Sequence, residues 1–170
     1  MKILVMGLPE SGKSTFAESL SKSLFATWIN ANQVRAKYDD WDFSVEGRIR
    51  QSQRMKYLSD GVVLAGGVAV ADFICPTEET RKEFNPDFII WMDTISVGKY
   101  EDTNKIFLPP EKCDVRISKW IDVNQLYKCL ENINPELDIN SRELDIKLLM
   151  AFKNWPGCNI GSGHRKGIEK

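Results

Sequence analysis

The segment GLPESGKST at residues 7–15 constrains the fold more than any other feature of this 170-residue chain. It fits the pattern G-x-x-x-x-G-K-[ST], in which backbone N–H groups at the start of a helix hold phosphate oxygens. The pattern is informative only between a strand and a helix. Both neighbours are expected, because the apolar run KILVM precedes the segment and residues 13–24 carry Phe16, Leu20 and Leu24 on one helical face. The segment therefore predicts a phosphate-binding loop, called here the phosphate loop (residues 7–15).

Short runs rich in Val and Ile alternate with longer amphipathic segments along the chain. The runs are KILVM, ATWIN, GVAVADFIC, DFIIWMD and DVRIS. This alternation is typical of a parallel sheet joined by crossover helices. Further helices are expected at residues 46–63, from Thr77 onward, at 122–131 and at 141–153. We therefore predict an α/β fold of three layers, in which a parallel five-stranded sheet is flanked by helices.

Two segments have no clear helical or strand period. Residues 94–113 combine charge, glycine and a proline pair, and a loop of this length in a compact domain is usually functional or disordered. Lys99, Asp102 and Lys105 in this segment suit a lid over bound phosphates. The composition then changes at NWPGCNIGSGHRKGIEK. We expect one domain over residues 1–153 and a C-terminal tail over residues 154–170.

Charge and cysteine content limit the class of protein. Lys and Arg number 23 against 24 Asp and Glu, so the formal net charge of −1 gives no global field for nucleic acid or an anionic membrane. The cysteines form no CxxC pair and His164 is the single histidine, which does not favour zinc. No stretch approaches the ~18 apolar residues of a membrane span. A cytoplasmic protein with reduced thiols is expected.

The phosphate loop predicts a site for ATP and Mg²⁺. Its candidate nucleotide-binding residues are Gly7, Pro9, Glu10, Ser11, Gly12, Lys13, Ser14 and Thr15. Lys13 is expected to span the outer phosphates as a catalytic charge, and the Ser14 hydroxyl to hold Mg²⁺. Asp72 follows the run VAVA near a strand end, where a carboxylate holds Mg²⁺ or receives a hydroxyl proton; a simple cap at the strand end is the alternative.

Glu10 places a carboxylate where a polyanion should bind. The loop binds phosphate mainly through backbone donors, so this side chain can point outward and the acid need not spoil the site. If the position requires a positive φ, a residue other than glycine costs on the order of 1 kcal/mol. We expect a tolerated loop with slightly weakened nucleotide affinity.

Later segments carry a resemblance to a known family. INANQVR, FSVEGR, FICPTEETR and DTNK follow the phosphate loop in the order and spacing of the adenylylsulfate kinases, so the chain resembles this family over about residues 1–130. It also resembles adenylylsulfate-kinase-like proteins of bacteriophages. The resemblance implies a P-loop kinase fold, transfer of the ATP γ-phosphate to the 3′-hydroxyl of adenylylsulfate, a small-molecule nucleotide acceptor, and a homodimer as in many members.

The resemblance also implies which residues bind the acceptor. They are Asn30, Arg35, Phe43, Arg48, Gln51, Pro76, Arg81 and Lys105. Asn30 and Asn32 stand where the family motif D-G-D-x-x-R has aspartates, and Gln51 replaces an asparagine. Losing both aspartates removes the obvious general base, and Asp72 is the candidate replacement. Asn32 is then either an altered catalytic position or an ordinary hydrogen-bonding residue at a helix start.

Three functions remain open from the sequence. The first is the kinase of adenylylsulfate that the resemblance implies. The second keeps the chemistry but uses another hydroxyl, such as a nucleotide or a hydroxymethylated pyrimidine in phage DNA, although the net charge of −1 does not favour nucleic acid. The third is a catalytically silent ATP-binding module, which Glu10, Asn30 and Asn32 together suggest.

Overall fold

The computed structural model describes residues 1–133 and 158–160. In these residues the strands are β1 (Lys2–Met6), β2 (Thr27–Asn30), β3 (Ala69–Asp72), β4 (Phe88–Met92), β5 (Val115–Ile117) and β6 (Cys158–Ile160). The helices are α1 (Lys13–Leu24), α2 (Ala31–Tyr38), α3 (Val45–Leu64), α4 (Glu78–Phe84), α5 (Glu101–Ile106) and α6 (Val123–Ile133). The strands form one sheet in the order β2-β3-β1-β4-β5-β6, and every neighbouring pair is parallel.

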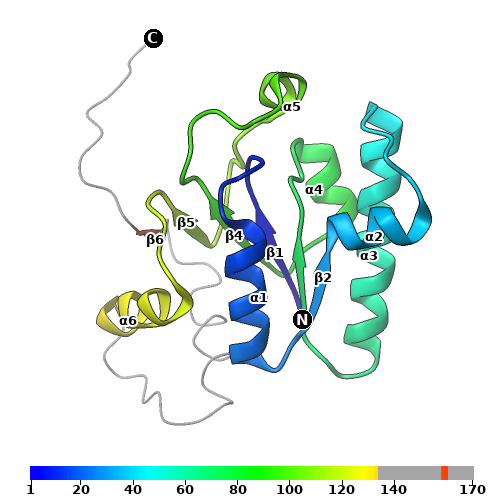
Figure 1. The fold of residues 1–170 in the computed structure, drawn as a ribbon. Coiled ribbons are helices and arrows are strands. Elements are labelled where there is room, and N and C mark those ends of the chain that lie inside the picture. The colour runs from blue at the N-terminus through cyan, green and yellow to red at the C-terminus, as the bar shows by residue number, and fades with distance from the viewer. Residues whose placement is uncertain (134–157, 161–170) are drawn as a thin grey trace.

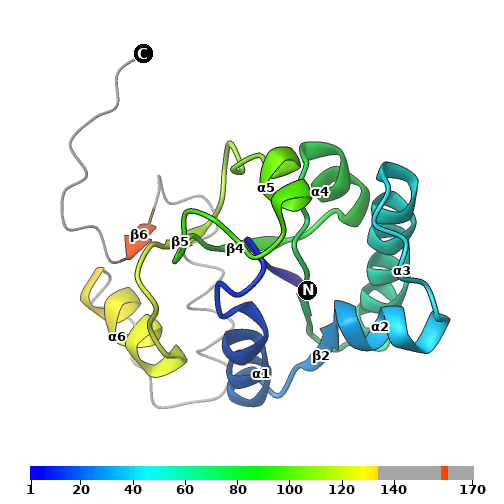
Figure 2. The ribbon, with the colours of Figure 1, turned by 45° about the horizontal axis from the view of Figure 1, so that its top comes forward.

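The sheet lies between two layers of helices (Figure 1 and Figure 2). Strand β1 is central and buried on both faces, which explains why its sequence is continuously apolar rather than alternating. Ile3 and Val5 join the core cluster that contains residues of α1 and α6. Leu4 and Met6 join the opposite cluster, with residues of α2, α3 and α4. The predicted three-layer α/β fold with a parallel sheet is confirmed.

Two short elements lie where the sequence shows no period. Helix α5 lies within residues 94–113, which were expected to be a loop, and its six residues are too few to show an apolar repeat. Strand β6 lies within residues 154–170, which were expected to be a tail, and pairs Cys158 with Val115 along the edge of β5. The helix expected at residues 141–153 and the domain end expected at residue 153 fall outside the described residues.

The carboxyl ends of the central strands meet at one edge of the sheet. Asp72, the last residue of β3, is in register with Val5 of β1 and with Asn30 of β2. The phosphate loop leaves β1 at this edge and enters α1. Ligands of open α/β sheets bind at such an edge. None of the described helices has the length and apolar character that a membrane span requires.

Candidate active site

Glycines shape the two ends of the phosphate loop. Gly7 has φ 146°, and a side chain there would collide with the carbonyl oxygen of Met92. Gly12 has φ 87°, caps α1, and lies against the indole of Trp120. Both positions therefore exclude a side chain for conformational and steric reasons. The loop has the backbone form that the sequence motif requires.

Glu10 has φ 69°, in the left-handed region that favours glycine. The position therefore does require a positive φ, and the backbone of Glu10 carries a strain on the order of 1 kcal/mol. Its side chain is exposed and lines a cavity beside the loop. The carboxylate thus stays solvated while the backbone follows the loop.

Lys13 folds back onto the phosphate loop. Its side chain is buried, and Nζ donates a hydrogen bond of 2.6 Å to the carbonyl oxygen of Leu8. Burial lowers the pKa of Lys13 to about 8, although the nearby Asp72 carboxylate opposes this effect. The buried Ser11 hydroxyl has no hydrogen-bond partner among the described residues. A weakly solvated cation and an unpaired hydroxyl fit a phosphate group bound in this loop.

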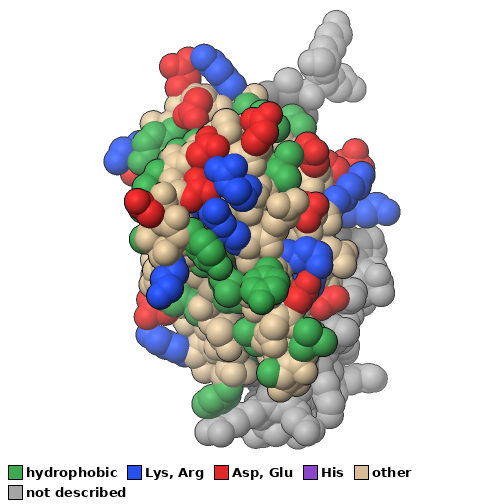
Figure 3. Space-filling view, turned by 90° about the vertical axis from the view of Figure 1, so that its right-hand side faces the viewer, with side chains coloured by type: hydrophobic (Ala, Val, Ile, Leu, Met, Phe, Trp, Pro, Cys, Tyr) green, Lys and Arg blue, Asp and Glu red, His purple; other side chains and the backbone are tan. Residues whose placement is uncertain are grey.

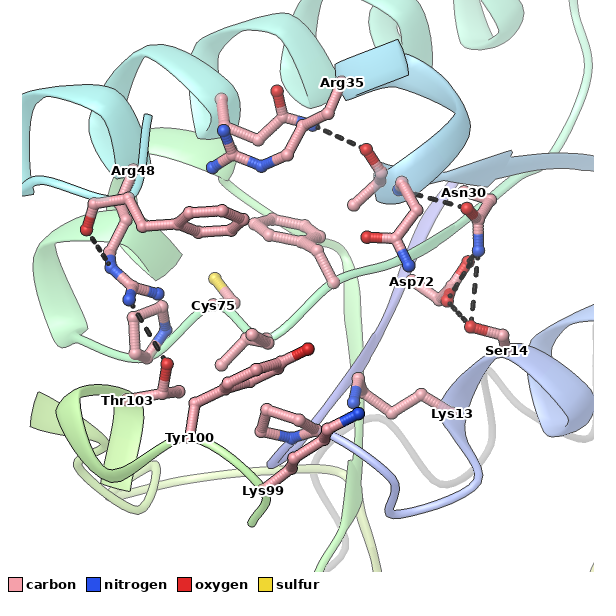
Figure 4. Close-up of a pocket in the computed structure, with 18 of the residues that line it drawn as sticks. Lys13, Ser14, Asn30, Arg35, Arg48, Asp72, Cys75, Lys99, Tyr100 and Thr103 are labelled. Carbon is pink, nitrogen blue, oxygen red and sulfur yellow. Dashed lines mark hydrogen bonds between the residues drawn. The ribbon is translucent and has the colours of Figure 1, made fainter. Parts of the chain in front are cut away.

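Asp72 is the centre of a hydrogen-bond network beside the loop, shown in Figure 4. It is 2% exposed. Ser14 Oγ donates to Oδ2 at 2.6 Å, and Trp28 Nε1 donates to Oδ1 at 2.7 Å. Asn30 Nδ2 lies 3.1 and 3.2 Å from the two carboxylate oxygens. Ser14 and Asp72 thus present adjacent oxygens, the ligand type that Mg²⁺ prefers.

Asn30 connects this network to α2. Its Oδ1 accepts hydrogen bonds from the backbone N–H groups of Asn32 and Gln33, so Asn30 rather than Asn32 is the helix cap. Its Nδ2 donates to Asp72, a bond that an ionised aspartate at this position cannot make. An amide at position 30 therefore suits a site whose carboxylate is on β3. Asn32 lines the neighbouring cavity.

A cavity of about 650 Å³ extends from the phosphate loop to the start of α3. Most of the residues expected to bind the acceptor line it, namely Asn30, Arg35, Phe43, Arg48, Gln51 and Pro76. Trp41, Lys99 and Tyr100 also line it. In Figure 4, Lys99 and Tyr100 lie near Lys13, across the cavity from Arg35. The cavity therefore extends from the phosphate loop to a region lined by aromatic side chains.

The two cavity arginines are already bonded to protein oxygens. Arg35 Nη1 donates to the carbonyl oxygens of Asp40 and Asp42 at 3.0 and 2.9 Å. Arg48 Nε donates to the Phe43 carbonyl at 2.8 Å. The Phe43 ring lies 4.6 Å from the Arg35 guanidinium and 5.6 Å from that of Arg48. Burial lowers the pKa of both arginines, which remain charged. They hold the cavity wall in shape.

Arg81 and Lys105 are not among the residues that line the cavity. Arg81 is buried and donates to the carbonyl oxygens of Cys75 and Leu108, so it joins the end of β3 to the segment after α5. Lys105 is exposed and pairs with Glu101 at 2.8 Å. Lys99 is the lysine of this segment that reaches the cavity.

Gln51 offers an unused acceptor in the cavity wall. It is 3% exposed, and its Nε2 donates to the Ala31 carbonyl at 3.1 Å. Its Oε1 is buried and has no hydrogen-bond partner in the described part of the chain. A ligand that presents an N–H or O–H group satisfies this oxygen.

Comparisons with known proteins identify the family. The profile of the adenylylsulphate kinases matches residues 1–131. The chain belongs to this family. An adenylyl-sulfate kinase of Thermodesulfovibrio yellowstonii is 32% identical over 123 residues, which cover 68% of this chain and 56% of the relative. The chain thus matches little more than half the length of that curated protein.

Solved structures agree on the fold of this adenylylsulfate kinase family member. The APS kinase of Mycobacterium tuberculosis, in complex with AMPPNP and APS, has a TM-score of 0.62 at 16% identity and covers 79% of this chain and 97% of its own. A hexameric APS kinase from Thiobacillus denitrificans has a TM-score of 0.61 at 20% identity, covering 78% and 29%. At these identities the likeness concerns the fold, which is that of the P-loop kinases.

Trp28 is a site residue of this family member that its sequence motifs do not indicate. The period of two in β2 places Trp28 and Asn30 on the same face of the strand. Since Asn30 is in register with Asp72, the same alternation brings the indole N–H to that carboxylate. Strand alternation was the available signal, whereas the contact itself depends on the side-chain rotamer.

Proposed function

We propose that the chain is an ATP-dependent kinase that transfers the γ-phosphate to the 3′-hydroxyl of adenylylsulfate. The observation that carries this proposal is the position of Asp72, which bonds to Ser14 of the phosphate loop and lines the same cavity as the predicted acceptor residues. In this proposal the phosphate donor and the acceptor hydroxyl therefore lie on either side of one buried carboxylate, that of Asp72. Membership of the adenylylsulfate kinase family supports the choice of acceptor.

In this proposal the chain acts mainly by positioning and charge. Lys13 leaves the Leu8 carbonyl and binds the outer phosphates. Ser14 and Asp72 would hold Mg²⁺, and the bound ion would neutralise phosphate charge. The acceptor oxygen bonds to the γ-phosphorus, the bond from that phosphorus to the β,γ-bridging oxygen breaks, ADP leaves, and the hydroxyl proton passes to Asp72. Trp28 and Asn30 orient the Asp72 carboxylate throughout.

The cavity walls suit a nucleotide acceptor. Trp41, Phe43 and Tyr100 supply aromatic surface for a base, and Lys99 supplies a cation near the phosphate loop. The open Gln51 Oε1 accepts one hydrogen bond from the ligand. Arg35 and Arg48 already donate to protein carbonyl oxygens. Their main contributions to the acceptor site are therefore positive charge and the shape of the cavity wall rather than new hydrogen bonds.

The deciding experiment measures ADP release from Mg·ATP with and without adenylylsulfate. We expect release that depends on the acceptor, and a loss of about 100-fold or more in Asp72→Asn. The matched control is Asp93→Asn, because Asp93 lies directly after β4, as Asp72 lies at the end of β3, but pairs with Arg116 outside the cavity lining. The control should lose less than about threefold. Equal losses in the two variants would contradict the role given to Asp72.

Another hydroxyl compound is the second candidate for the acceptor. Arg35 and Arg48 already donate to protein carbonyl oxygens, which favours an acceptor with less negative charge than adenylylsulfate. Nucleosides and nucleotides tested in the same assay distinguish the two. DNA is less favoured, because Figure 3 shows basic side chains interspersed with acidic ones. Arg50 on α3, for example, pairs with Asp40 and Asp42 in the connection between α2 and α3. ATP binding without turnover on any acceptor would instead establish a silent module.

A further inference from the structure

We propose that Trp120 stacks on the nucleobase of the phosphate donor. The inference rests on the proposed function, in that the phosphate loop must bind a nucleoside triphosphate. It adds a base-binding surface that lies apart from the acceptor cavity. Three observations carry it: the contact of Trp120 with the loop, the exposure of its ring, and its side of the sheet.

Trp120 lies directly against the phosphate loop. A Cβ built on Gly12 would be 2.5 Å from Trp120 Nε1 and 2.7 Å from Cδ1, so the indole touches the residue that caps α1. The absence of a side chain at Gly12 therefore leaves room for the indole and also allows the positive φ. Nevertheless, 49% of Trp120 is exposed. Part of this large aromatic side chain thus remains available beside the residues that hold phosphate.

The sheet order places Trp120 on the donor side of the loop. Trp120 follows β5, whereas Asn30 and Asp72 end β2 and β3, and β1 with its phosphate loop lies between these two groups. Figure 2 shows the β5–α6 connection on one side of α1, with α2 and α3 on the other. The acceptor cavity is lined by the phosphate loop, by residues at and after the ends of β2 and β3, by α3 and by residues 99–103, and its lining does not include Trp120.

A nucleoside triphosphate in the loop has two ends. Its γ-phosphate must face the acceptor cavity, so its nucleoside leaves the loop in the other direction. An exposed indole on that side presents a π-face to the base. Stacking of a base on an aromatic side chain changes affinity by roughly tenfold or more and depends little on which base is bound. We therefore expect guanine and adenine nucleotides to bind with similar affinity, within about fivefold.

The experiment compares Mg·ADP with inorganic tripolyphosphate by calorimetry. The variants are Trp120→Ala, Trp120→Phe and the control Tyr57→Ala, which removes an aromatic side chain that is 75% exposed on α3. We expect Trp120→Ala to weaken Mg·ADP about tenfold and to leave tripolyphosphate within about twofold, because tripolyphosphate has no base. Trp120→Phe retains a ring and should lose less than about threefold. Tyr57→Ala should change neither ligand.

The outcomes separate this inference from the proposed function. An unchanged dissociation constant for Mg·ADP in Trp120→Ala overturns the inference, and so does an equal loss for tripolyphosphate, which would mean that the indole only supports the loop. Either result leaves acceptor-dependent turnover by the wild type intact. A base-dependent loss in a chain that turns over no acceptor supports the inference and overturns the proposed kinase activity. A wild type that binds neither ligand overturns both.

Discussion

At the scale of single residues, Glu10 combines backbone strain with a misplaced charge. Its φ of 69° favours glycine, and its carboxylate lies beside an anion site. We expect Glu10→Gly to tighten Mg·ADP binding by about fivefold, on the order of 1 kcal/mol for a charge a few ångströms away near the surface. Glu10→Gln removes the charge but keeps the positive φ. If Gln reproduces the gain, charge dominates; a gain in neither variant contradicts the expected penalty.

Lys13 makes nucleotide binding depend on pH. Burial lowers its pKa to about 8 in the free protein, and a bound polyphosphate favours the protonated form. Affinity for Mg·ADP should therefore be constant below pH 8 and fall by up to tenfold per pH unit above it. Lys13→Met should bind weakly with no such decline, as calorimetry between pH 6.5 and 9.5 will show. The same depressed pKa makes stability rise above pH 8, since the unfolded state then binds more protons.

Trp28 tests whether the orientation of Asp72 matters for transfer. Trp28→Phe keeps the ring and removes only the N–H that donates to Oδ1 at 2.7 Å. We expect kcat to fall about tenfold, while KM for ATP changes less than about threefold, because the lost bond acts on the reacting carboxylate. Steady-state kinetics measure both. A lower free energy of unfolding together with kcat and KM that change by similar factors would indicate a merely structural role.

At the scale of elements, α5 is hydrogen-bonded to α3, and the segment before α5 is hydrogen-bonded to the phosphate loop. Arg48 Nη2 donates to Asp102 and Thr103, each at 3.2 Å, and the Thr94 hydroxyl donates to the Ser11 carbonyl at 2.8 Å. Gly98 and Asn104 exchange two hydrogen bonds that close the segment before α5. The segment expected to be a loop is therefore held by specific contacts over the acceptor cavity.

We expect Thr103→Val to destabilise the protein by about 1 kcal/mol, since a buried hydrogen bond to Arg48 is lost without a large change in volume. KM for the acceptor should rise more than KM for ATP. Lys105→Ala is the control on the same helix, because its pair with Glu101 is 70% and 83% exposed and contributes little. Denaturant unfolding and kinetics measure these effects. An equal or larger effect of Lys105→Ala would contradict the assignment.

At the scale of the whole molecule, local sequence patterns predicted the elements whose structure depends on residues close together in the chain. The phosphate loop, the five expected strands and α1 each carry their own motif or period. The positions of Asp72, Asn30 and Ser14 then follow from parallel strands that end at one edge. Helix α5 and strand β6 were missed because each is short and held by long-range contacts. Lys99 and Lys105 lie in one segment, and only the fold decides which of them reaches the cavity.

The expected end of the domain at residue 153 gives a prediction for the entire chain. A protein of residues 1–153 should fold and bind Mg·ADP with unchanged affinity, because the phosphate loop, Asp72 and Trp120 all precede the cut. It should melt several degrees lower, since it lacks β6, whose pairing with β5 involves three residue positions. Lost bonds of ~0.5–1.5 kcal/mol each, at about 2–4 °C per kcal/mol, give this scale. Calorimetric melting measures the shift, and a truncated chain that fails to fold would place the boundary beyond residue 153.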